Sequence, residues 1–525
     1  MILDKIRSVL GLKKKGGEKE IIVSSEKLER RVAVLENGRL EEFAIERDSD
    51  RQISGNIYKG RVKNLEAGLK AMFVDIGVDK NAFLHYWDAV PAADAGVETI
   101  ERSGKKKSNK RITADDIPKL YPPGSEVVVQ VTKGPIGTKG ARISTNLSLP
   151  GRYLVLCPFS DQFGISRKIE DPKERQRLRK ILNELDVPDG VGVIIRTVGE
   201  GQKARYFVRD LAMLLEEWRQ IEDRIKSTKA PSVLFEEPDL IERTVRDFLT
   251  EEVDRIIVDD EQAAQRMSDL VGRISKRSQR KIRHYNEPTP IFERFNVDKQ
   301  IDNAFRRQVW LACGGYLVID ETEALVAIDI NTGRNKGGRD QDKTILNTNL
   351  EAAEEISRQM RLRNIGGLVV IDFIDMKDRR DRNAVYQKLK EGIKRDKAKT
   401  NVLPISELGL LEMTRQRVQE SISRTLYDEC PHCRGRGRIK SSESMSVEVQ
   451  RAIIRVMRMH PDIHELRVHV HPSLIERFKA DDEEHLLELE RRFDGRLSFR
   501  SEPKFHIEEF KILNTLTEEE LMAKS

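Results

Sequence analysis

The stretch from about 305 to 426 constrains the fold most, because short apolar runs with strand periodicity alternate there with longer runs of helical spacing. The runs YLVID and ALVAIDI predict a hairpin turning at Glu321-Thr322-Glu323, and GLVVIDFID and NVLPIS predict two later strands. A charged helix is expected over about 379–398. An earlier helix is predicted by apolar residues at helical spacing: Leu346, Leu350, Ala353, Ile356 and Met360. This ββαβαβ order predicts an α/β layer.

Two of these strands carry an aspartate where an apolar run ends. Asp329 closes ALVAID, and Asp372 lies in LVVID. A charge there is costly unless it has a partner, and neighbouring strand ends of an α/β sheet converge on one crevice. Two carboxylates brought together repel each other, and a hard cation such as Mg²⁺ relieves that repulsion. Helix caps, or ion pairs with the many arginines, are the alternative interpretation.

The segment NTGRNKGGRD, which follows the strand ALVAIDI, favours phosphate binding. Its glycines let the backbone approach a phosphate closely, and Arg334, Lys336 and Arg339 add positive charge. Asn331 lies two residues beyond Asp329, on the same face of an extended segment, where its amide would orient water or phosphate. Because phosphodiester cleavage uses a divalent ion in this way, the pattern favours a metal-dependent phosphodiesterase over a purely structural role.

Composition sets the broad class of the protein. At 525 residues the chain is too long for one ordinary core, so several domains are expected. The net charge of +6 is small against 94 basic and 88 acidic residues, so charge alone identifies no partner. Four cysteines do not make a disulfide framework in a chain this long, and no run of about 18 apolar residues is present. We therefore expect a cytoplasmic protein without a transmembrane span.

The first 20 residues are expected to form a tail. The segment MILDKIRSVLGLKKKGG lacks a small-residue cleavage site and is a poor secretory signal. Its apolar residues would share one side of a helix that ends in Lys13-Lys14-Lys15, which would suit weak docking on a membrane surface or on a partner protein. A frayed tail is the alternative, and it is favoured.

The rest of the chain divides by periodicity. RRVAVLENGRLEEFAIER predicts a hairpin turning at Asn37-Gly38. Short strands with glycines at the turns predict a small antiparallel barrel over about 53–145. Strands and charged helices alternate over about 146–240, and the last domain, about 442–525, is predicted as helix, strand, helix, strand.

The segment CPHC supplies two cysteines at zinc-ligand spacing, Cys430 and Cys433. A structural zinc site needs four ligands, and Cys157 and Cys313 lie far away in apolar strands. In one hypothesis, histidines of the last domain complete the site within one chain: His460, His464, His469 and His471. In the other, two chains each donate Cys430 and Cys433, and the metal joins a dimer.

Several motifs, taken in order, resemble those of the ribonuclease E/G family. They are GNIYKGRV, AMFVDIG, GISRKIE, VIIRTVG, EALVAIDINTGR, NTNLEAAEEISRQMRLRNIGGLVVIDFIDM, LGLLEMTRQR and CPHCRGRG. The resemblance implies an α+β multidomain chain in which an S1 (OB-fold) barrel and a 5′-sensor interrupt an RNase H-like subdomain. The implied domains are an N-terminal tail (1–20), a first RNase H-like segment (21–52), the S1 RNA-binding domain (53–145), the 5′-sensor (146–240), a second RNase H-like segment (241–304), a DNase I-like α/β catalytic subdomain (305–426), a zinc link (427–441) and a small α/β C-terminal domain (442–525).

The resemblance also implies an activity. The chain would be a magnesium-dependent endoribonuclease that cleaves single-stranded, A/U-rich, 5′-monophosphorylated RNA in rRNA processing or mRNA decay. The products would carry 5′-phosphate and 3′-hydroxyl ends. Among the family members, the sequence is expected to be closer to the short ones than to those with a long disordered tail.

The family's site residues carry over motif by motif. The implied catalytic residues are Asp329, Asp372 and Asn331, with Mg²⁺ held by the two aspartates. Cys430 and Cys433 would hold a structural Zn²⁺ shared between the chains of a homodimer or homotetramer. The expected RNA contacts are Phe73, Phe83, Lys139, Arg334 and Lys399, and the implied 5′-phosphate pocket comprises Gly151, Val155, Arg196 and Thr197. Lys399 departs from the family pattern, which commonly has an arginine near the catalytic site.

Two other classes of function compete with this hypothesis. A non-catalytic RNA-binding or scaffold protein would keep the barrel without the chemistry, although the intact AIDIN and VIDFID motifs argue against it. A DNA nuclease or another phosphodiesterase would use the same carboxylates, and competition between matched RNA and DNA oligomers discriminates between the two.

Overall fold

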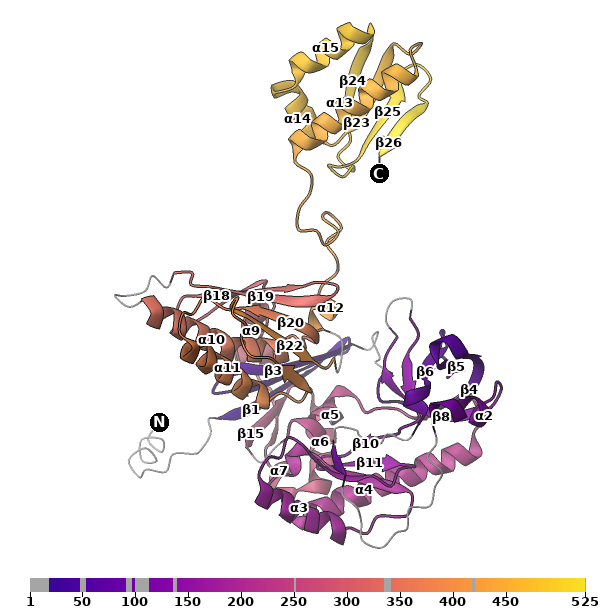
Figure 1. The fold of residues 1–525 in the computed structure, drawn as a ribbon, viewed down its shortest axis with the longest axis vertical. Helices are drawn as coiled ribbons and strands as arrows, with labels where there is room; N and C mark the ends of the chain where they lie inside the picture. The colour runs from indigo at the N-terminus through magenta and orange to yellow at the C-terminus, as the bar shows by residue number, and fades with distance from the viewer. Residues whose placement is uncertain are drawn as a thin grey trace. The chain divides into compact units, whose positions relative to one another are not determined.

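The computed structural model describes residues 18–47, 53–90, 97–99, 113–135, 139–249, 252–334, 341–417 and 421–524. The chain divides into two compact units, Met1–Thr425 and Leu426–Ser525 (Figure 1). The predicted N-terminal helix, Lys336 and Arg339 lie outside the described residues. Within the described portion of the chain, no helix is long and apolar enough to cross a membrane.

The first sheet joins strands from two distant regions of the sequence. In spatial order they are β16 (Ile282–His284), β15 (Val253–Val258), β1 (Lys19–Ser25), β2 (Glu29–Glu36) and β3 (Arg39–Arg47). Strands β1, β15 and β16 run parallel, whereas β2 and β3 continue the sheet as an antiparallel hairpin. The hairpin turns at Asn37 and Gly38 as predicted, and both residues have positive φ (53° and 77°), the conformation that an Asn-Gly turn favours.

A closed barrel follows β3 in the sequence, and the prediction of a small barrel is confirmed. Five strands form the ring: β4 (Ile57–Glu66), β5 (Ala71–Asp75), β6 (Ala82–His85), β9 (Arg142–Ser144) and β8 (Glu126–Lys133). The ring closes because β4 pairs with both β5 and β8. A later strand, β14 (Ser232–Phe235), adds to β4. Side chains of period two fill the barrel, among them Val62, Met72 and Leu84.

A third sheet and two helices form the next layer. The strands in spatial order are β10 (Leu149–Pro150), β11 (Leu154–Pro158), β13 (Val191–Ile195), β12 (Phe163–Ser166) and β7 (Val97–Thr99). Helices α3 (Pro172–Glu184) and α4 (Ala204–Ser227) contribute their apolar faces to one core with this sheet. Phe207 and Trp218 of α4 are buried in that core.

The fourth sheet is built from the region of about 305–426, in which the sequence predicted an α/β layer. Its strands in spatial order are β17 (Gln308–Trp310), β18 (Tyr316–Glu321), β19 (Leu325–Asn331), β20 (Gly367–Asp372), β22 (Leu410–Arg415) and β21 (Thr400–Val402). Strand β19 pairs antiparallel with β18 and parallel with β20. The predicted hairpin and the predicted helices are confirmed, the latter as α10 (Gln341–Leu362) and α11 (Arg379–Lys394). Both helices pack on one face of the sheet (Figure 1) and leave the other face open.

The second unit is a small α/β domain with more elements than predicted. It contains α13 (Ser442–Met459), β23 (Glu465–Val470), α14 (Pro472–Ala480), α15 (Glu483–Phe493), β24 (Arg496–Ser501), β25 (Phe510–Asn514) and β26 (Glu520–Lys524). The predicted helix-strand-helix-strand order omitted α14, β25 and β26. Helix α14 is short and begins at Pro472, directly after its N-cap His471, and β25 pairs antiparallel with β23.

A buried ion pair fastens the loop before β21 to the fourth sheet. The Arg415 guanidinium donates to both carboxylate oxygens of Asp396 (2.6 and 3.0 Å), and the two side chains are only 5% and 3% exposed. The same guanidinium donates to the backbone carbonyl of Ile365. Removing one partner of such a pair leaves a buried charge without compensation.

We therefore expect Arg415→Met to lower the free energy of unfolding by about 3–5 kcal/mol, because Asp396 then stays buried and unpaired. Urea unfolding would measure the change. The double substitution Arg415→Met with Asp396→Asn should recover much of the loss. Arg307→Met, which breaks the exposed pair with Asp320, is the matched control and should lower the free energy of unfolding by less than about 1 kcal/mol. An equal loss of stability in Arg415→Met and Arg307→Met would contradict the special role of the buried pair.

Candidate functional site

The two predicted metal ligands lie side by side. Strands β19 and β20 are parallel and in register, and Asp329 is the pairing partner of Asp372. Neighbouring strands are about 4.8 Å apart, so both carboxylates rise from adjacent positions on the same sheet face. This is the open face, because Ile328 and Ile371 point to the opposite side and are buried under the helices. The predicted convergence of the two aspartates is confirmed.

The aspartate pair carries excess negative charge. Partial desolvation, together with the charges of Asp329 and Asp375, raises the pKa of Asp372 above its ordinary value. Within the described residues no basic side chain lowers that pKa. Asp375 follows β20 and joins the acidic surroundings of the pair. Such a cluster is stabilised by a cation from outside the chain.

Asn331 lies two positions beyond Asp329, on the same face of β19. Its side-chain amide donates to Asp329 Oδ2 at 2.6 Å, which fixes the orientation of that carboxylate. Beyond it, Gly333 has a φ of +54°, and a Cβ there would approach the carbonyl oxygen of Gly314 to 2.6 Å. Arg334 follows, and its backbone N–H donates to the Gly314 carbonyl (2.9 Å). The turn therefore places an exposed arginine just beyond the end of β19, five residues after Asp329.

Helix α10 holds the loops on both sides of the site, a role that sequence analysis missed. The buried Asn349 side chain donates to the Ile374 carbonyl (2.8 Å) and accepts from the Ile374 N–H (3.2 Å), which fixes the segment after Asp372. Glu351 accepts from the backbone N–H groups of Ala312 and Cys313 between β17 and β18. A polar residue at a buried helical position was the available signal.

The barrel gathers the three residues predicted to bind single-stranded RNA. Phe73 and Phe83 are paired across β5 and β6, half-buried, with ring centroids 5.9 Å apart in an edge-to-face arrangement. The segment that carries the exposed Lys139 runs beside β6, where Phe83 N–H donates to the Ala141 carbonyl. The two aromatic rings and Lys139 thus come from neighbouring segments of the barrel.

The predicted 5′-phosphate residues also lie together, with one feature that was not predicted. Arg196 follows β13 and donates to the Gly151 carbonyl, and its other terminal nitrogen donates to Asp247 at 2.9 Å. Thr197 is exposed next to it, and Val155 lies on the neighbouring strand β11. The arginine is therefore held by a carboxylate, which an incoming phosphate would have to displace.

Asp210 shapes the backbone of this pocket. The carboxylate, on α4, accepts the backbone N–H groups of Arg152, Tyr153 and Leu154 at 2.8–3.1 Å. Burial raises the pKa of Asp210, although the three hydrogen bonds oppose that shift. Gly151 is needed here, since a Cβ at that position would approach the Asp210 carboxylate to 2.7 Å.

Lys399 does not join the aspartate pair. It precedes β21, where Thr400 pairs with Arg415, which in turn pairs with Gly367 at the start of β20. Asp372 lies at the opposite end of β20, roughly 17 Å along the strand. Contact with RNA elsewhere on the sheet remains a prediction for Lys399.

The CPHC segment orients its first thiol. Backbone N–H groups of Cys433 and His432 donate to the Cys430 sulfur and, with the Cys433 side chain, lower the pKa of Cys430. A lowered thiol pKa favours the thiolate that metals bind.

No third ligand joins the two cysteines among the described residues. The four predicted histidines are not gathered there. Instead His506 lies against His432, with ring centroids 4.6 Å apart, and its Nε2 is 2.7 Å from the His432 carbonyl. Its Nδ1 accepts from the Glu508 N–H (3.1 Å), so both ring nitrogens are engaged.

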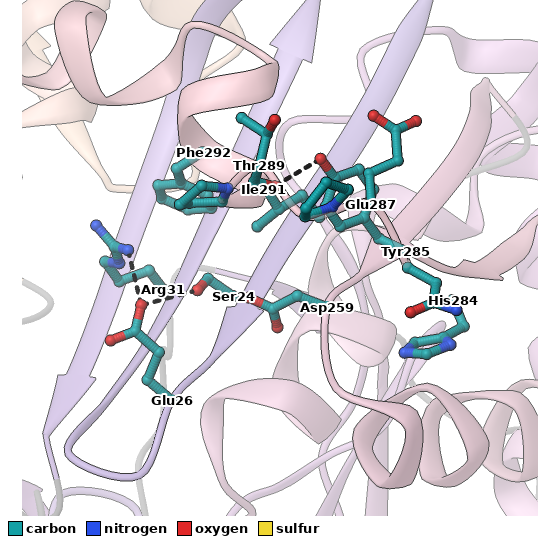
Figure 2. A pocket seen from close by; sticks show the side chains of 13 residues that line it. Ser24, Glu26, Arg31, Asp259, His284, Tyr285, Glu287, Thr289, Ile291 and Phe292 are labelled. Carbon is teal, nitrogen blue, oxygen red and sulfur yellow. Dashed lines mark hydrogen bonds and ion pairs between the residues drawn. The ribbon is translucent and has the colours of Figure 1, made fainter.

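A hollow of about 270 Å³ lies near the carboxyl ends of β1 and β15, in the first sheet (Figure 2). Glu26 accepts from Arg31 (3.2 Å) and from the Ser24 hydroxyl (3.4 Å). Asp259 accepts from the Ser25 N–H (2.8 Å). Glu26 is thus paired with an arginine of the protein, whereas the charges that act on Asp372 are acidic, so we do not assign the chemistry to this hollow.

Family membership follows from sequence comparison. The Ribonuclease E/G family model matches residues 148–418, and the model of the RNase E/G thioredoxin-like domain matches residues 429–515. Ribonuclease G of Escherichia coli (strain K12) is 40% identical over 496 residues, covering 94% of this chain and 99% of that protein. The chain belongs to the ribonuclease E/G family.

Other members of the ribonuclease E/G family match as well. Ribonuclease G of Haemophilus influenzae is 38% identical over 496 residues, with the same coverage. Ribonuclease E of Escherichia coli (strain K12) is 39% identical over 438 residues, which cover 82% of this chain and 40% of that protein. The thioredoxin-like match refines the predicted small α/β domain.

The raised pKa of Asp372 predicts a stability effect. Between the unfolded and folded pKa values, the folded protein binds more protons, so stability falls as pH rises through that window. We expect Asp372→Asn to raise the unfolding temperature in chelator at neutral pH, because the amide cannot ionise. Asp320→Asn should instead lower the unfolding temperature, since hydrogen bonding to Arg307 lowers the pKa of Asp320. A destabilised Asp372→Asn variant in thermal unfolding would contradict this.

Proposed function

We propose that this chain is a magnesium-dependent endoribonuclease that hydrolyses single-stranded RNA to 5′-phosphate and 3′-hydroxyl ends, in rRNA processing or mRNA decay. Membership of the ribonuclease E/G family makes it an endoribonuclease. The observation that carries the finer proposal is the in-register pairing of Asp329 with Asp372 on an open sheet face.

The aspartate pair fits a hard divalent cation. Both groups offer oxygen ligands, and Mg²⁺ takes one or two carboxylates while it keeps several waters, so a closed cage of ligands is not required. The raised pKa of Asp372 supports this fit, because no cation of the described chain offsets the clustered charge. When bound, the ion would supply positive charge against the phosphate and the leaving oxygen.

Residues of the chain itself would position the RNA. Asn331 holds Asp329 in one orientation and has a second amide hydrogen with which to donate to a phosphoryl oxygen. Arg334 is exposed beyond the same strand and can pair with phosphate.

The barrel would bind the single strand away from the cleavage point. Phe73 and Phe83 offer ring surfaces on which bases stack, and Lys139 adds charge for the backbone. Stacking on such rings contributes roughly 1–3 kcal/mol per base and tolerates many sequences. A preference for A/U-rich strands would follow from their weak internal pairing.

The Arg196 pocket would sense a 5′-monophosphate. Arg196 is poised on Asp247, and Thr197 adds an exposed hydroxyl beside it. A phosphate would compete with Asp247 for the guanidinium, so the pocket would bind a doubly charged phosphate more tightly than a hydroxyl.

Zinc would join two chains in the proposed assembly. Cys430 and Cys433 supply two ligands, while tetrahedral zinc takes four. Two chains would complete the set and give a homodimer, or a homotetramer if two dimers combine. We place the enzyme in the cytoplasm, where its four free cysteines would stay reduced, and weak docking by the N-terminal tail belongs to the same proposal.

Asp329→Asn should abolish cleavage of an A/U-rich RNA oligomer by the purified protein, because the substitution removes one proposed metal ligand. Chelation should stop the wild type, and Mg²⁺ should restore it. Asp320→Asn, on the neighbouring strand and paired with Arg307, should cleave normally. Cleavage of a matched DNA oligomer at the same rate, or full activity of Asp329→Asn, would refute the proposal.

Arg196→Ala should remove the preference for 5′-monophosphorylated over 5′-hydroxyl oligomers while the rate on 5′-hydroxyl RNA stays the same. The reason is that only the phosphorylated end would use the guanidinium. Arg219→Ala, an exposed arginine of α4, serves as the control. Initial rates on the two oligomers measure the effect. A preserved preference would show that the phosphate is sensed elsewhere.

A further inference from the structure

Two aromatic side chains lie on the open face of the fourth sheet, beside the aspartate pair. Trp310 ends β17, Tyr316 begins β18, and the two residues pair directly. Their ring centroids are 5.2 Å apart at an interplanar angle of 57°. Trp310 is 52% exposed, although its neighbours Val309 and Leu311 are buried on the opposite face. The core therefore does not require a tryptophan here.

Strand register ties this aromatic pair to Asp329 and Asn331. Tyr316 pairs with Asn331, and Val318 pairs with Asp329, so Tyr316 is the diagonal neighbour of Asp329. Directly paired residues share a face, and diagonal neighbours lie about 7–8 Å apart. A nucleotide bound at the carboxylates would thus bring an adjoining base within reach of the rings.

The turn between the two aromatic residues is held in place, and an arginine lies beside the Trp310 ring. Glu351 accepts from the N–H groups of Ala312 and Cys313, which anchors the turn between the two strands. The Arg334 guanidinium lies 5.5 Å from the centroid of the Trp310 ring. An exposed aromatic surface with an arginine beside it is the combination that single-stranded nucleic acids use for stacking and charge neutralisation.

We propose that Trp310 and Tyr316, with Arg334, form a stacking subsite for an RNA base next to the cleaved phosphate, on the Asn331 side of the aspartate pair. The proposal rests on the proposed function, since it takes the aspartate pair as the point of cleavage. The positive charge of Arg334 and the closeness of the rings to Asp329 in the sheet favour a nucleotide as the occupant over a second protein chain.

The test measures RNA binding separately from cleavage. Binding of a fluorescent A/U-rich RNA oligomer would be followed by anisotropy in chelator, with wild type, Trp310→Ala and Trp310→Phe. We expect Trp310→Ala to weaken binding at least about 5-fold, the equivalent of roughly 1 kcal/mol of stacking, and Trp310→Phe to retain most of the affinity. Leu368→Ala removes an exposed apolar side chain at the other end of β20 and should change nothing.

An abasic scan makes the readout specific to stacking. Oligomers in which one base at a time is replaced by an abasic site should bind the wild type more weakly at one position next to the cleaved bond, in addition to the positions that stack on Phe73 and Phe83. That penalty should vanish in Trp310→Ala, because base and ring act as one pair. Thermal unfolding checks that the variants are folded.

Three outcomes would overturn the subsite: unchanged binding by folded Trp310→Ala, an abasic penalty next to the cleaved bond that persists in that variant, or a change in oligomeric state without a change in RNA affinity. The last would mean that a second copy of the chain covers the rings. Cleavage that continues in chelator or in Asp329→Asn would instead refute the metal assignment, and the binding result would stand apart from it.

Discussion

The parallel register of β19 on β20 is the constraint on which the candidate site depends. Strand side chains alternate with period two, so a slip of one residue would turn Asp372 toward α10 and α11 and expose Ile371. Burial of the apolar face therefore selects the register that brings Asp372 beside Asp329. The hydrophobic effect, acting on one face of the sheet, sets the distance between two charges on the other.

Helix α10 links the two faces of that sheet. Its apolar residues Ala353, Ile356 and Met360 fill the core, while Asn349 and Glu351 reach past the strand ends to hold the adjoining loops. One element thus fixes both the strands and the segments that follow and precede them. Rigid support of this kind keeps functional groups within the small tolerances that catalysis needs.

Two ion pairs elsewhere in the unit are formed entirely by the protein. Arg415 is paired with Asp396 in the core, and Arg196 with Asp247 beside the residues proposed to bind the 5′-phosphate. The aspartate pair is different, because the groups that surround Asp372 in the described chain are also acidic. This unmatched charge is the feature on which the proposed cation site rests.

The sequence predicted β18, β19, β20 and β21, both helices and the two aspartates of this sheet from regular periodicity, whereas β17 and β22 were not predicted. Trp310 and Tyr316 were missed, since a tryptophan and a tyrosine that are not adjacent along the chain become neighbours only through the hairpin register. The pairing of Arg196 with Asp247 was likewise hidden, because it joins residues 51 positions apart on different elements. Local patterns predict elements well, whereas contacts between elements depend on the packed fold.

The first sheet has a consequence for how the chain is made. Strand β1 is completed by β15, and the hydrogen-bonded residues Ser25 and Asp259 are 234 positions apart. At ribosomal speeds of about 5–20 residues per second, the earliest hairpin waits roughly 10–50 s for its neighbour. During that time its unpaired edge can recruit other nascent strands. The barrel is synthesised between β1 and β15. Because it closes on its own residues, it is also an advantage during synthesis.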